Sequence, residues 1–206
     1  MGSMETRSRY RDMKKGNQEI GKRPGSVRII GGEWRGRSLP VRDLPGLRPS
    51  GDRGRETLFN WLQAHVRGAV CVDLFAGSGA LGLEAASRGA AEVILVEKLS
   101  LAARDLRDIL LALKADQVTV VESDALQWLH SCPAQSLDIA FVDPPFGLHL
   151  ETRALELIRI GDCIRPGGFV YVETARDAPA IVPGPGWETT RDKTMGDVRL
   201  LLLKKI

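Results

Sequence analysis

The chain has 206 residues, of which 43% are hydrophobic, so it is long and apolar enough for one domain with a substantial core. It has no apolar run of membrane-spanning length, no apolar signal region, and no metal-ligand or disulfide spacing among its three cysteines and three histidines, so we expect a cytoplasmic protein without a metal site. Residues 1–60 hold 14 Lys/Arg against 7 Asp/Glu, within a total net charge of +3, and this basic concentration favours a polyanionic partner.

Residues 1–26 are polar and charged, and we expect them to form a disordered basic arm whose first three residues are a cloning scar. Residues 27–30 have the pattern of a short strand, and Gly31-Gly32 then turns the chain. Residues 33–41 are expected to return as a second strand, which would complete a β-hairpin.

The predicted hairpin carries candidate RNA contacts. Alternation along its second strand would place Arg35 and Arg37 on one face and Trp34 on the other. An arginine face suits the RNA backbone, although arginines that are merely exposed would give the same pattern.

A loop over residues 42–51 leads to a helix that Ser50 or Asp52 would cap. Apolar residues recur along this helix at Leu58, Leu62 and Val66, so one face is expected to pack against the protein. Arginines crowd the loop and the start of the helix, at positions Arg48, Arg53 and Arg55. We therefore divide the chain into the arm, an appendage over residues 27–66, and a main domain over residues 67–206.

Strands and helices alternate through the main domain. Expected strands cover residues 69–75, 92–97, 118–121, 137–142 and 169–174, and expected helices cover 79–88, 100–114, 125–130 and 150–160. This alternation predicts an α/β fold with a mostly parallel sheet and helices on both faces. Two final strands, 187–190 and 198–203, flank a turn near Gly196 and predict an antiparallel pair at the sheet edge.

The strand over residues 137–142 stops at Asp143-Pro144-Pro145-Phe146. Two prolines cannot donate to a sheet ladder, so the backbone must leave the sheet here while its carbonyls stay able to accept. Asp143 adds an acceptor, and Phe146 offers a face for stacking. This combination suits the planar amine of a nucleobase; the alternative is a simple turn before proline.

A glycine motif joins the first strand of the main domain to its helix. Gly77, Gly79 and Gly82 form G-x-G-x-x-G, and Glu97 ends the next strand, which is also the spacing of an NAD-binding fingerprint. Asp73 distinguishes NAD from a cationic ligand, because a carboxylate at this position would repel a pyrophosphate and attract a cation. S-adenosylmethionine carries an ammonium and a sulfonium and no phosphate.

Three acids at successive strand ends suit such a ligand, with Asp73 near its amino group, Glu97 on its ribose hydroxyls and Asp124 on its adenine amine. The alternative for each acid is a surface carboxylate or a helix cap. The candidate cofactor-binding residues are Asp73, Phe75, Gly77, Gly79, Glu97, Asp124 and Ala125.

With these motifs, the chain resembles the class I S-adenosylmethionine-dependent methyltransferases that methylate exocyclic amines. Four further segments, residues 28–37, 47–49, 52–62 and 73–83, are similar to the bacterial 16S rRNA guanine-N2 methyltransferases that modify the guanine conventionally numbered 966. The resemblance covers about residues 27–203. Ser50 and Gly54 depart from the family pattern, where threonine and a branched apolar residue are expected.

The resemblance implies a Rossmann-like, seven-stranded sheet with a reversed C-terminal hairpin, and an appendage over the active site. It implies methyl transfer to guanine N2, with S-adenosylhomocysteine as the product and no metal. Asp143 and Pro144 would accept from the amine, and Phe146 would stack on the extruded base. The implied partner is 16S rRNA in the small ribosomal subunit, and we expect a monomer.

The candidate RNA-binding residues are Arg35, Arg37, Arg48, Arg53 and Thr57. Three alternatives stay open from the sequence: an adenine-N6 methyltransferase on RNA or DNA, an NAD-dependent oxidoreductase, and a noncatalytic RNA-binding protein.

Overall fold

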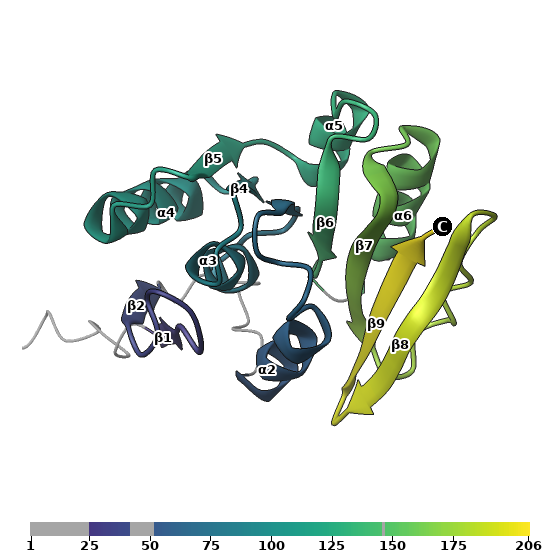
Figure 1. Cartoon of the computed structure of the whole chain (residues 1–206), viewed down its shortest axis with the longest axis horizontal. Helices are drawn as coiled ribbons and strands as arrows, with labels where there is room; N and C mark the ends of the chain where they lie inside the picture. The colour runs from purple at the N-terminus through teal and green to yellow at the C-terminus, as the bar shows by residue number, and fades with distance from the viewer. Residues whose placement is uncertain (1–24, 42–51, 146) are drawn as a thin grey trace, which may run out of the picture.

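A seven-stranded sheet forms the centre of the computed structural model, which describes residues 25–41, 52–145 and 147–206 (Figure 1). Its strands are β3 (Val70–Asp73), β4 (Glu92–Glu97), β5 (Val118–Glu122), β6 (Leu137–Val142), β7 (Ile164–Ala175), β8 (Trp187–Met195) and β9 (Val198–Lys205). They lie in the order β5-β4-β3-β6-β7-β9-β8, and all run in the same direction except β9, which pairs antiparallel with both β7 and β8. The predicted mostly parallel sheet with a reversed C-terminal hairpin is confirmed.

Helices cover both faces of this sheet. One face carries α2 (Asp52–Trp61), α3 (Ala80–Ser87) and α4 (Ser100–Leu113), and the other carries α5 (Ala125–His130) and α6 (Leu150–Ile160). Side chains alternate along β6, so Ile139 and Phe141 enter one core while Ala140 and Val142 enter the other. No helix within the described ranges has the length and apolarity needed to cross a membrane.

Two strands are longer than the sequence predicts. β7 begins at Ile164 rather than at residue 169, because the β6–β7 register shifts between Leu137 and Ile139 and accommodates a Pro-Gly-Gly segment within the strand. β8 continues to Met195 rather than ending at residue 190. The charged residues in the second half of this strand do not give the apolar pattern from which a strand is predicted, because polar residues are typical of an exposed edge strand.

The N-terminal hairpin is shorter than predicted. It pairs β1 (Gly25–Arg28) with β2 (Ser38–Val41), and residues 29–37 form the connection. The prediction of a strand starting at residue 33 is wrong, because residues 33–36 form a turn. Trp34 is nevertheless buried, while Arg35 and Arg37 are exposed.

A buried carboxylate attaches this hairpin to α3. Glu84 accepts hydrogen bonds from the N–H groups of Ile30 and Gly31, each at 2.8 Å, and its carboxylate pairs with Arg88 at 2.7 Å. Ser87 donates to the Gly31 carbonyl at 2.6 Å and accepts from the Trp34 N–H at 2.9 Å. Glu84 is fully buried, so these partners replace the water that its charge would otherwise need.

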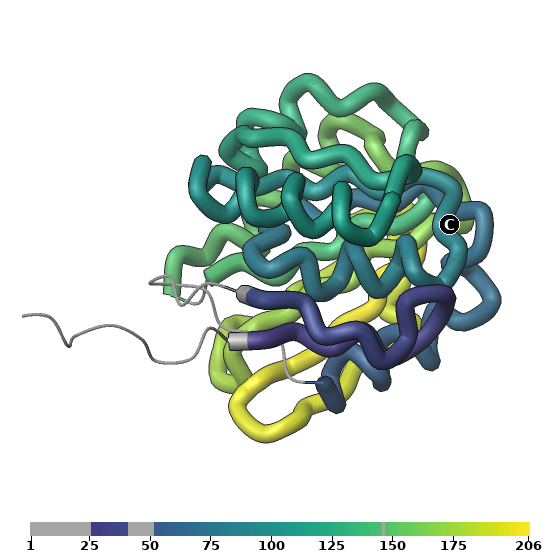
Figure 2. The backbone as a smooth tube through the Cα atoms, turned by 90° about the vertical axis from the view of Figure 1, so that its left-hand side faces the viewer, coloured from purple at the N-terminus to yellow at the C-terminus, as the bar shows by residue number. Residues whose placement is uncertain are grey.

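Close backbone approach at the end of α3 fixes the direction of the hairpin. Gly32 has φ +79°, and a Cβ at this position would lie 1.8 Å from the Ser87 carbonyl oxygen, so only glycine fits. Because α3 starts after β3 and ends at Ser87, the hairpin tip, which is hydrogen-bonded to Ser87, lies at the sheet edge opposite Asp73. The hairpin is on the side of the molecule that faces the viewer in Figure 2. The expected appendage over the active site is therefore not formed by the hairpin tip.

Helix α2 ends at Trp61, so it is shorter than the helix predicted to include Leu62 and Val66. Both residues are nevertheless buried, in the turns that follow the helix. Arg55 is 2% exposed and donates through Nη2 to the Arg28 carbonyl at 2.9 Å. The same nitrogen lies 2.6 Å from the Asp52 carboxylate. These contacts join α2 to the hairpin.

Substituting Glu84→Ala should destabilise the protein by about 3 kcal/mol, because two backbone donors and Arg88 lose their buried acceptor. Urea denaturation measures the loss. Glu92→Ala is the control, since Glu92 is an exposed acid at the start of β4 and should change stability by less than about 0.5 kcal/mol. Equal effects of the two substitutions would contradict the anchoring role of Glu84.

Candidate functional site

The carboxyl ends of the parallel strands gather acidic side chains at one edge of the sheet. The chain passes from β3 outward through β4 and β5 and then returns to β6 on the other side of β3. This reversal is the topological switch point at which open α/β sheets bind ligands. The acids at this edge include Asp73, Glu97, Glu122, Asp124, Asp143 and Glu173.

Asp73 ends β3 and is 1% exposed. Its Oδ2 accepts from the Gly82 N–H at 3.0 Å, whereas its buried Oδ1 has no hydrogen-bond partner within the described part of the chain. The pKa of Asp73 is raised to about 7, mainly by burial and also by the charges of Asp143 and Glu97, against the lowering effect of the backbone N–H groups of Gly82 and Phe75. An acceptor in this state favours a cationic ligand.

The glycine loop allows the backbone to lie close to such a ligand. Gly77 and Gly79 have φ of 52° and 75°, and Gly79 directly precedes α3. Gly82 packs on β4 so closely that a Cβ would lie 2.2 Å from Leu95 Cδ2. The glycines therefore serve loop geometry and helix–sheet packing, and Phe75 lies partly exposed at the start of the loop.

Glu97 stabilises this loop from the end of β4. Its Oε2 accepts from the Gly77 N–H at 2.8 Å, and its Oε1 accepts from the Leu99 N–H at 2.7 Å. Each carboxylate oxygen has a second acceptor site, so these bonds leave Glu97 able to accept from ribose hydroxyls.

Asp124 has a structural role as the N-cap of α5. Its Oδ1 accepts from the N–H groups of Leu126 and Gln127, and its Oδ2 lies 3.1 Å from Lys98 Nζ. The hydrogen bond with Lys98 is the main reason that the pKa of Asp124 is lowered. The helix-cap alternative considered for this residue is thus present, and the predicted adenine contact of Asp124 and buried Ala125 stays a prediction.

The D-P-P corner follows β6 directly. Asp143 is half-buried, and Pro144 is buried. The charge of Asp143 raises the pKa of both Asp73 and Glu173, so the three carboxylates form one electrostatic cluster. Phe146 lies outside the described residues.

Glu173 is a member of this cluster that the sequence prediction did not include. It lies near the end of β7, is 8% exposed, and accepts through Oε2 from the Tyr171 hydroxyl at 2.9 Å. Burial raises the pKa of Glu173 to about 7, and the charge of Asp143 adds to the shift. An acid near the end of a buried strand is the same signal that identified Asp73 and Glu97.

The candidate RNA-binding residues lie in different places. Thr57 is near the site edge, where its hydroxyl donates to Met195 Sδ at 3.7 Å, and Arg53 is exposed near the start of the same helix. Arg35 and Arg37 are on the hairpin connection, near the opposite edge. Arg48 lies outside the described residues.

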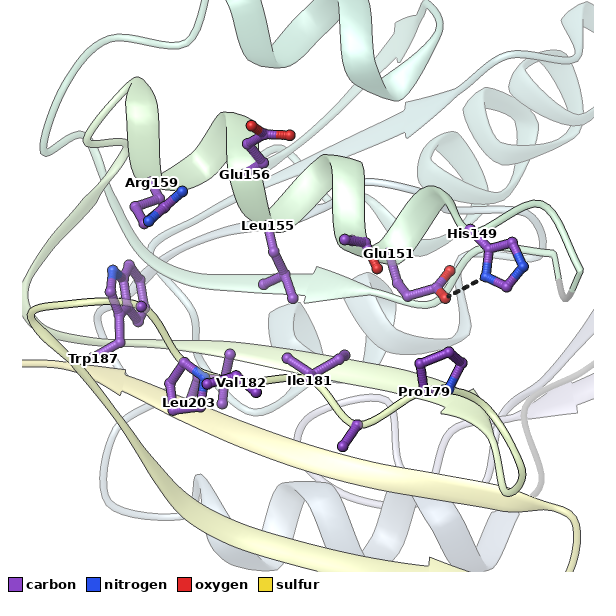
Figure 3. Close-up of a pocket in the computed structure, with 14 residues that line it drawn as sticks. His149, Glu151, Leu155, Glu156, Arg159, Pro179, Ile181, Val182, Trp187 and Leu203 are labelled. Carbon is purple, nitrogen blue, oxygen red and sulfur yellow. Dashed lines mark ion pairs between the residues drawn. The ribbon is translucent and has the colours of Figure 1, made fainter.

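A separate cavity of about 420 Å³ lies between α6 and the segment 179–187 (Figure 3). His149 and Glu151 form an ion pair of 3.7 Å at one end, and Arg159 and Trp187 lie toward the other. None of the predicted site residues lines this cavity. In the described ranges, no group of three or more His, Cys, Asp or Glu side chains is arranged to hold a metal ion.

Comparison with known proteins gives consistent matches. A family model described as conserved hypothetical protein 95 matches residues 27–204. Ribosomal RNA small subunit methyltransferase D of Haemophilus influenzae is 43% identical over 177 residues, covering 84% of this chain and 91% of the relative. The Escherichia coli protein of that name is 42% identical over 181 residues, covering 88% and 91%. The solved structure of yhhF from Escherichia coli, assigned as a methyltransferase, has a TM-score of 0.82 at 40% identity, covering 88% of this chain and 98% of that one.

The raised pKa of Asp73 gives a testable dependence of stability on pH. Its pKa is about 7 in the folded protein against an ordinary value of 3.8, so between these values the folded protein holds a proton that the unfolded chain has lost. The free energy of unfolding should therefore fall as pH rises toward 7, by about 1.4 kcal/mol per pH unit for one such group. Glu173 should add a similar share.

Asp73→Asn keeps an acceptor for Gly82 and removes the charge. The variant should show a shallower decline between about pH 5 and 7 and should be at least as stable as the wild type at pH 8, by urea denaturation. Asp116→Asn, at an exposed position, should keep the wild-type slope. If the stability of Asp73→Asn fell with pH as steeply as that of the wild type, the pKa of Asp73 would not be raised by burial of its charge.

Proposed function

Because the chain belongs to the family described as conserved hypothetical protein 95, together with the ribosomal RNA small subunit methyltransferase D proteins, we propose that it is the methyltransferase for one guanine N2 in 16S rRNA, at the position conventionally numbered 966. In this proposal the methyl donor is S-adenosylmethionine, and the monomeric enzyme acts in the cytoplasm on RNA within the small ribosomal subunit. The observation that carries the proposal is the buried, unpartnered Oδ1 of Asp73, which lies at the switch point beside the D-P-P corner.

The residues around Asp73 fit this methyl donor. Asp73 would accept from its ammonium, Glu97 from its ribose hydroxyls, and the Asp124–Ala125 turn would bind its adenine with Phe75 nearby. An NAD pyrophosphate fits less well, because Asp73 lies directly below the start of α3, where a phosphate would have to bind. The family match also favours methyl transfer over hydride transfer.

When bound, the donor supplies an electrophilic methyl group, which the amine lone pair takes as the carbon–sulfur bond breaks to give S-adenosylhomocysteine. Asp143 and the Pro144 carbonyl would accept the two N–H bonds of the amine and draw its lone pair out of the ring. After transfer the nitrogen loses one proton, to Asp143 or to water. Phe146 would stack on the extruded base, which holds the nitrogen in line with the methyl group.

The D-P-P corner by itself is compatible with adenine N6 as well as with guanine N2. The choice of guanine is supported by the resemblance of residues 28–62 to the guanine-N2 enzymes. The names of the relatives support an RNA of the small subunit as the substrate.

Labelled methyl transfer from S-adenosylmethionine to small subunits that lack the modification tests the proposal. Nucleoside analysis of the 16S rRNA should recover the label in N2-methylguanosine. Asp143→Ala should keep cofactor binding, measured by calorimetry, and lose turnover by a hundredfold or more, on the order of the effect of removing one preorganised catalytic group. Label in N6-methyladenosine, or no transfer at all, would overturn the assignment.

The hairpin arginines lead to a separate prediction about RNA binding. Removing two phosphate contacts by Arg35→Ala with Arg37→Ala should reduce the salt dependence of subunit binding, log K against log salt, by about 1.5. Turnover at saturating subunits should stay unchanged, because the hairpin tip lies at the edge opposite Asp143. Arg104→Ala, an exposed arginine on α4, is the control. An unchanged slope would show that Arg35 and Arg37 are only exposed.

A further inference from the structure

Glu173 lies next to the amine-binding corner. β6 and β7 run parallel and pair Phe141 with Tyr171 and Val142 with Val172. The next positions along these strands are Asp143 and Glu173, so the two carboxylates are neighbours on one face of the sheet. The charge of Asp143 raises the pKa of Glu173, which is consistent with this proximity.

The acids on this face form a row across three adjacent strands. Asp73 ends β3, Asp143 follows β6, and Glu173 lies on β7, in the spatial order of the sheet. Asp73 pairs with Phe141, and Phe141 pairs with Tyr171, so Asp143 and Glu173 lie two residues, roughly 7 Å, further toward the carboxyl ends of the strands than Asp73. Neighbouring strands are about 4.8 Å apart, so this staggered row separates a donor end at β3 from a base end at β6 and β7. The unpartnered, buried Oδ1 of Asp73 marks the donor end.

The Glu173 end of the row holds a buried acid whose orientation is fixed by a hydrogen bond. The Tyr171 hydroxyl donates to Oε2, which orients the carboxylate and leaves Oε1 able to accept. Glu173 pairs with Leu200 across β9, and a Cβ added to Gly54 of α2 would meet only Leu200 Cδ1, at 4.0 Å. The start of α2 therefore lies close to Leu200, the β9 partner of Glu173, at this end of the sheet.

The chemistry of the row matches the edge of guanine. Guanine presents two neighbouring donors, the N2 amine and the ring N1–H, whereas N1 of adenine is an acceptor. At pH values above its pKa of about 7, Glu173 is ionised, so that it accepts from N1–H and repels the lone pair of N1 in adenine. We propose that Glu173 is the specificity-determining residue that accepts from guanine N1–H while N2 lies at Asp143. This inference rests on the proposed function and adds to it the residue that distinguishes guanine from adenine.

The test replaces the target guanine with 2-aminopurine, which keeps the N2 amine and has an acceptor at N1. Small subunits would be reconstituted with 16S rRNA ligated to carry either base at the target position. At about pH 8.5, where Glu173 is ionised, the wild type should methylate guanine at least about a hundredfold better, by kcat/KM, because a site built around a hydrogen bond rejects a ligand that lacks its donor. Glu173→Gln should lower this preference at least tenfold, since its amide can donate to N1.

The change in preference must be specific to residue 173. Glu188→Gln, an exposed acid on β8, should keep the wild-type preference. Cofactor binding of Glu173→Gln should stay close to wild type. Its thermal unfolding at about pH 5, where Glu173 is protonated and neutral like the amide, should also stay close to wild type, because the amide oxygen still accepts from Tyr171. Loss of the guanine O6 affects both enzymes equally, so only a residue-specific change in the ratio counts in support.

Two outcomes would overturn this inference and leave the proposed function standing. The first is that the wild type methylates guanine and 2-aminopurine with equal kcat/KM. The second is that a folded Glu173→Gln keeps the wild-type preference for guanine. Failure of the wild type to form N2-methylguanosine on guanine-containing subunits would instead overturn the proposed function, and this inference with it.

Discussion

The parallel register of β3, β6 and β7 brings Asp73, Asp143 and Glu173 to one face at one edge of the sheet. Within the described residues, no Lys, Arg or His forms an ion pair with Asp73 or Glu173, and the pKa of each is raised to about 7. Keeping negative charges buried and close together is unfavourable for folding. A cationic methyl donor and the N–H groups of a base would relieve that repulsion. The same carboxylates that destabilise the fold would therefore make the site selective for these ligands.

Glu84 is also a buried acid, but its carboxylate is fully hydrogen-bonded and paired with a positive charge. Two backbone N–H groups and Arg88 surround its carboxylate, and Arg88 also lies 5.0 Å from the centre of the Phe59 ring on α2. This arrangement joins the hairpin, α3 and α2 into one unit and leaves Glu84 no role at the strand ends. The contrast between a satisfied acid and an unsatisfied one is the physical basis for separating structural from functional carboxylates in this protein.

Much of this could be predicted from local sequence. Residues 92–97, 125–130, 137–142 and 150–160 have the predicted bounds, because their periodicity is strong and their ends carry clear signals. The hairpin connection and the end of α2 were missed, since both depend on packing against α3 and β6 that no local pattern encodes. Glu173 was missed because one acid in an apolar run is ambiguous until the β6–β7 register places it beside Asp143. The position of Arg35 far from the site likewise depends on the docking of Gly32 against Ser87.

We propose that one row of carboxylates binds the methyl donor at β3 and the target base at β6 and β7. A cryo-electron microscopy structure of the protein on the unmodified small subunit, with S-adenosylhomocysteine bound, would show both ligands at once. We expect the cofactor amino group at Asp73, the guanine N2 within hydrogen-bond distance of Asp143 and the Pro144 carbonyl, and N1 facing Glu173. A base bound in the cavity beside α6, or a cofactor bound away from β3, would contradict it.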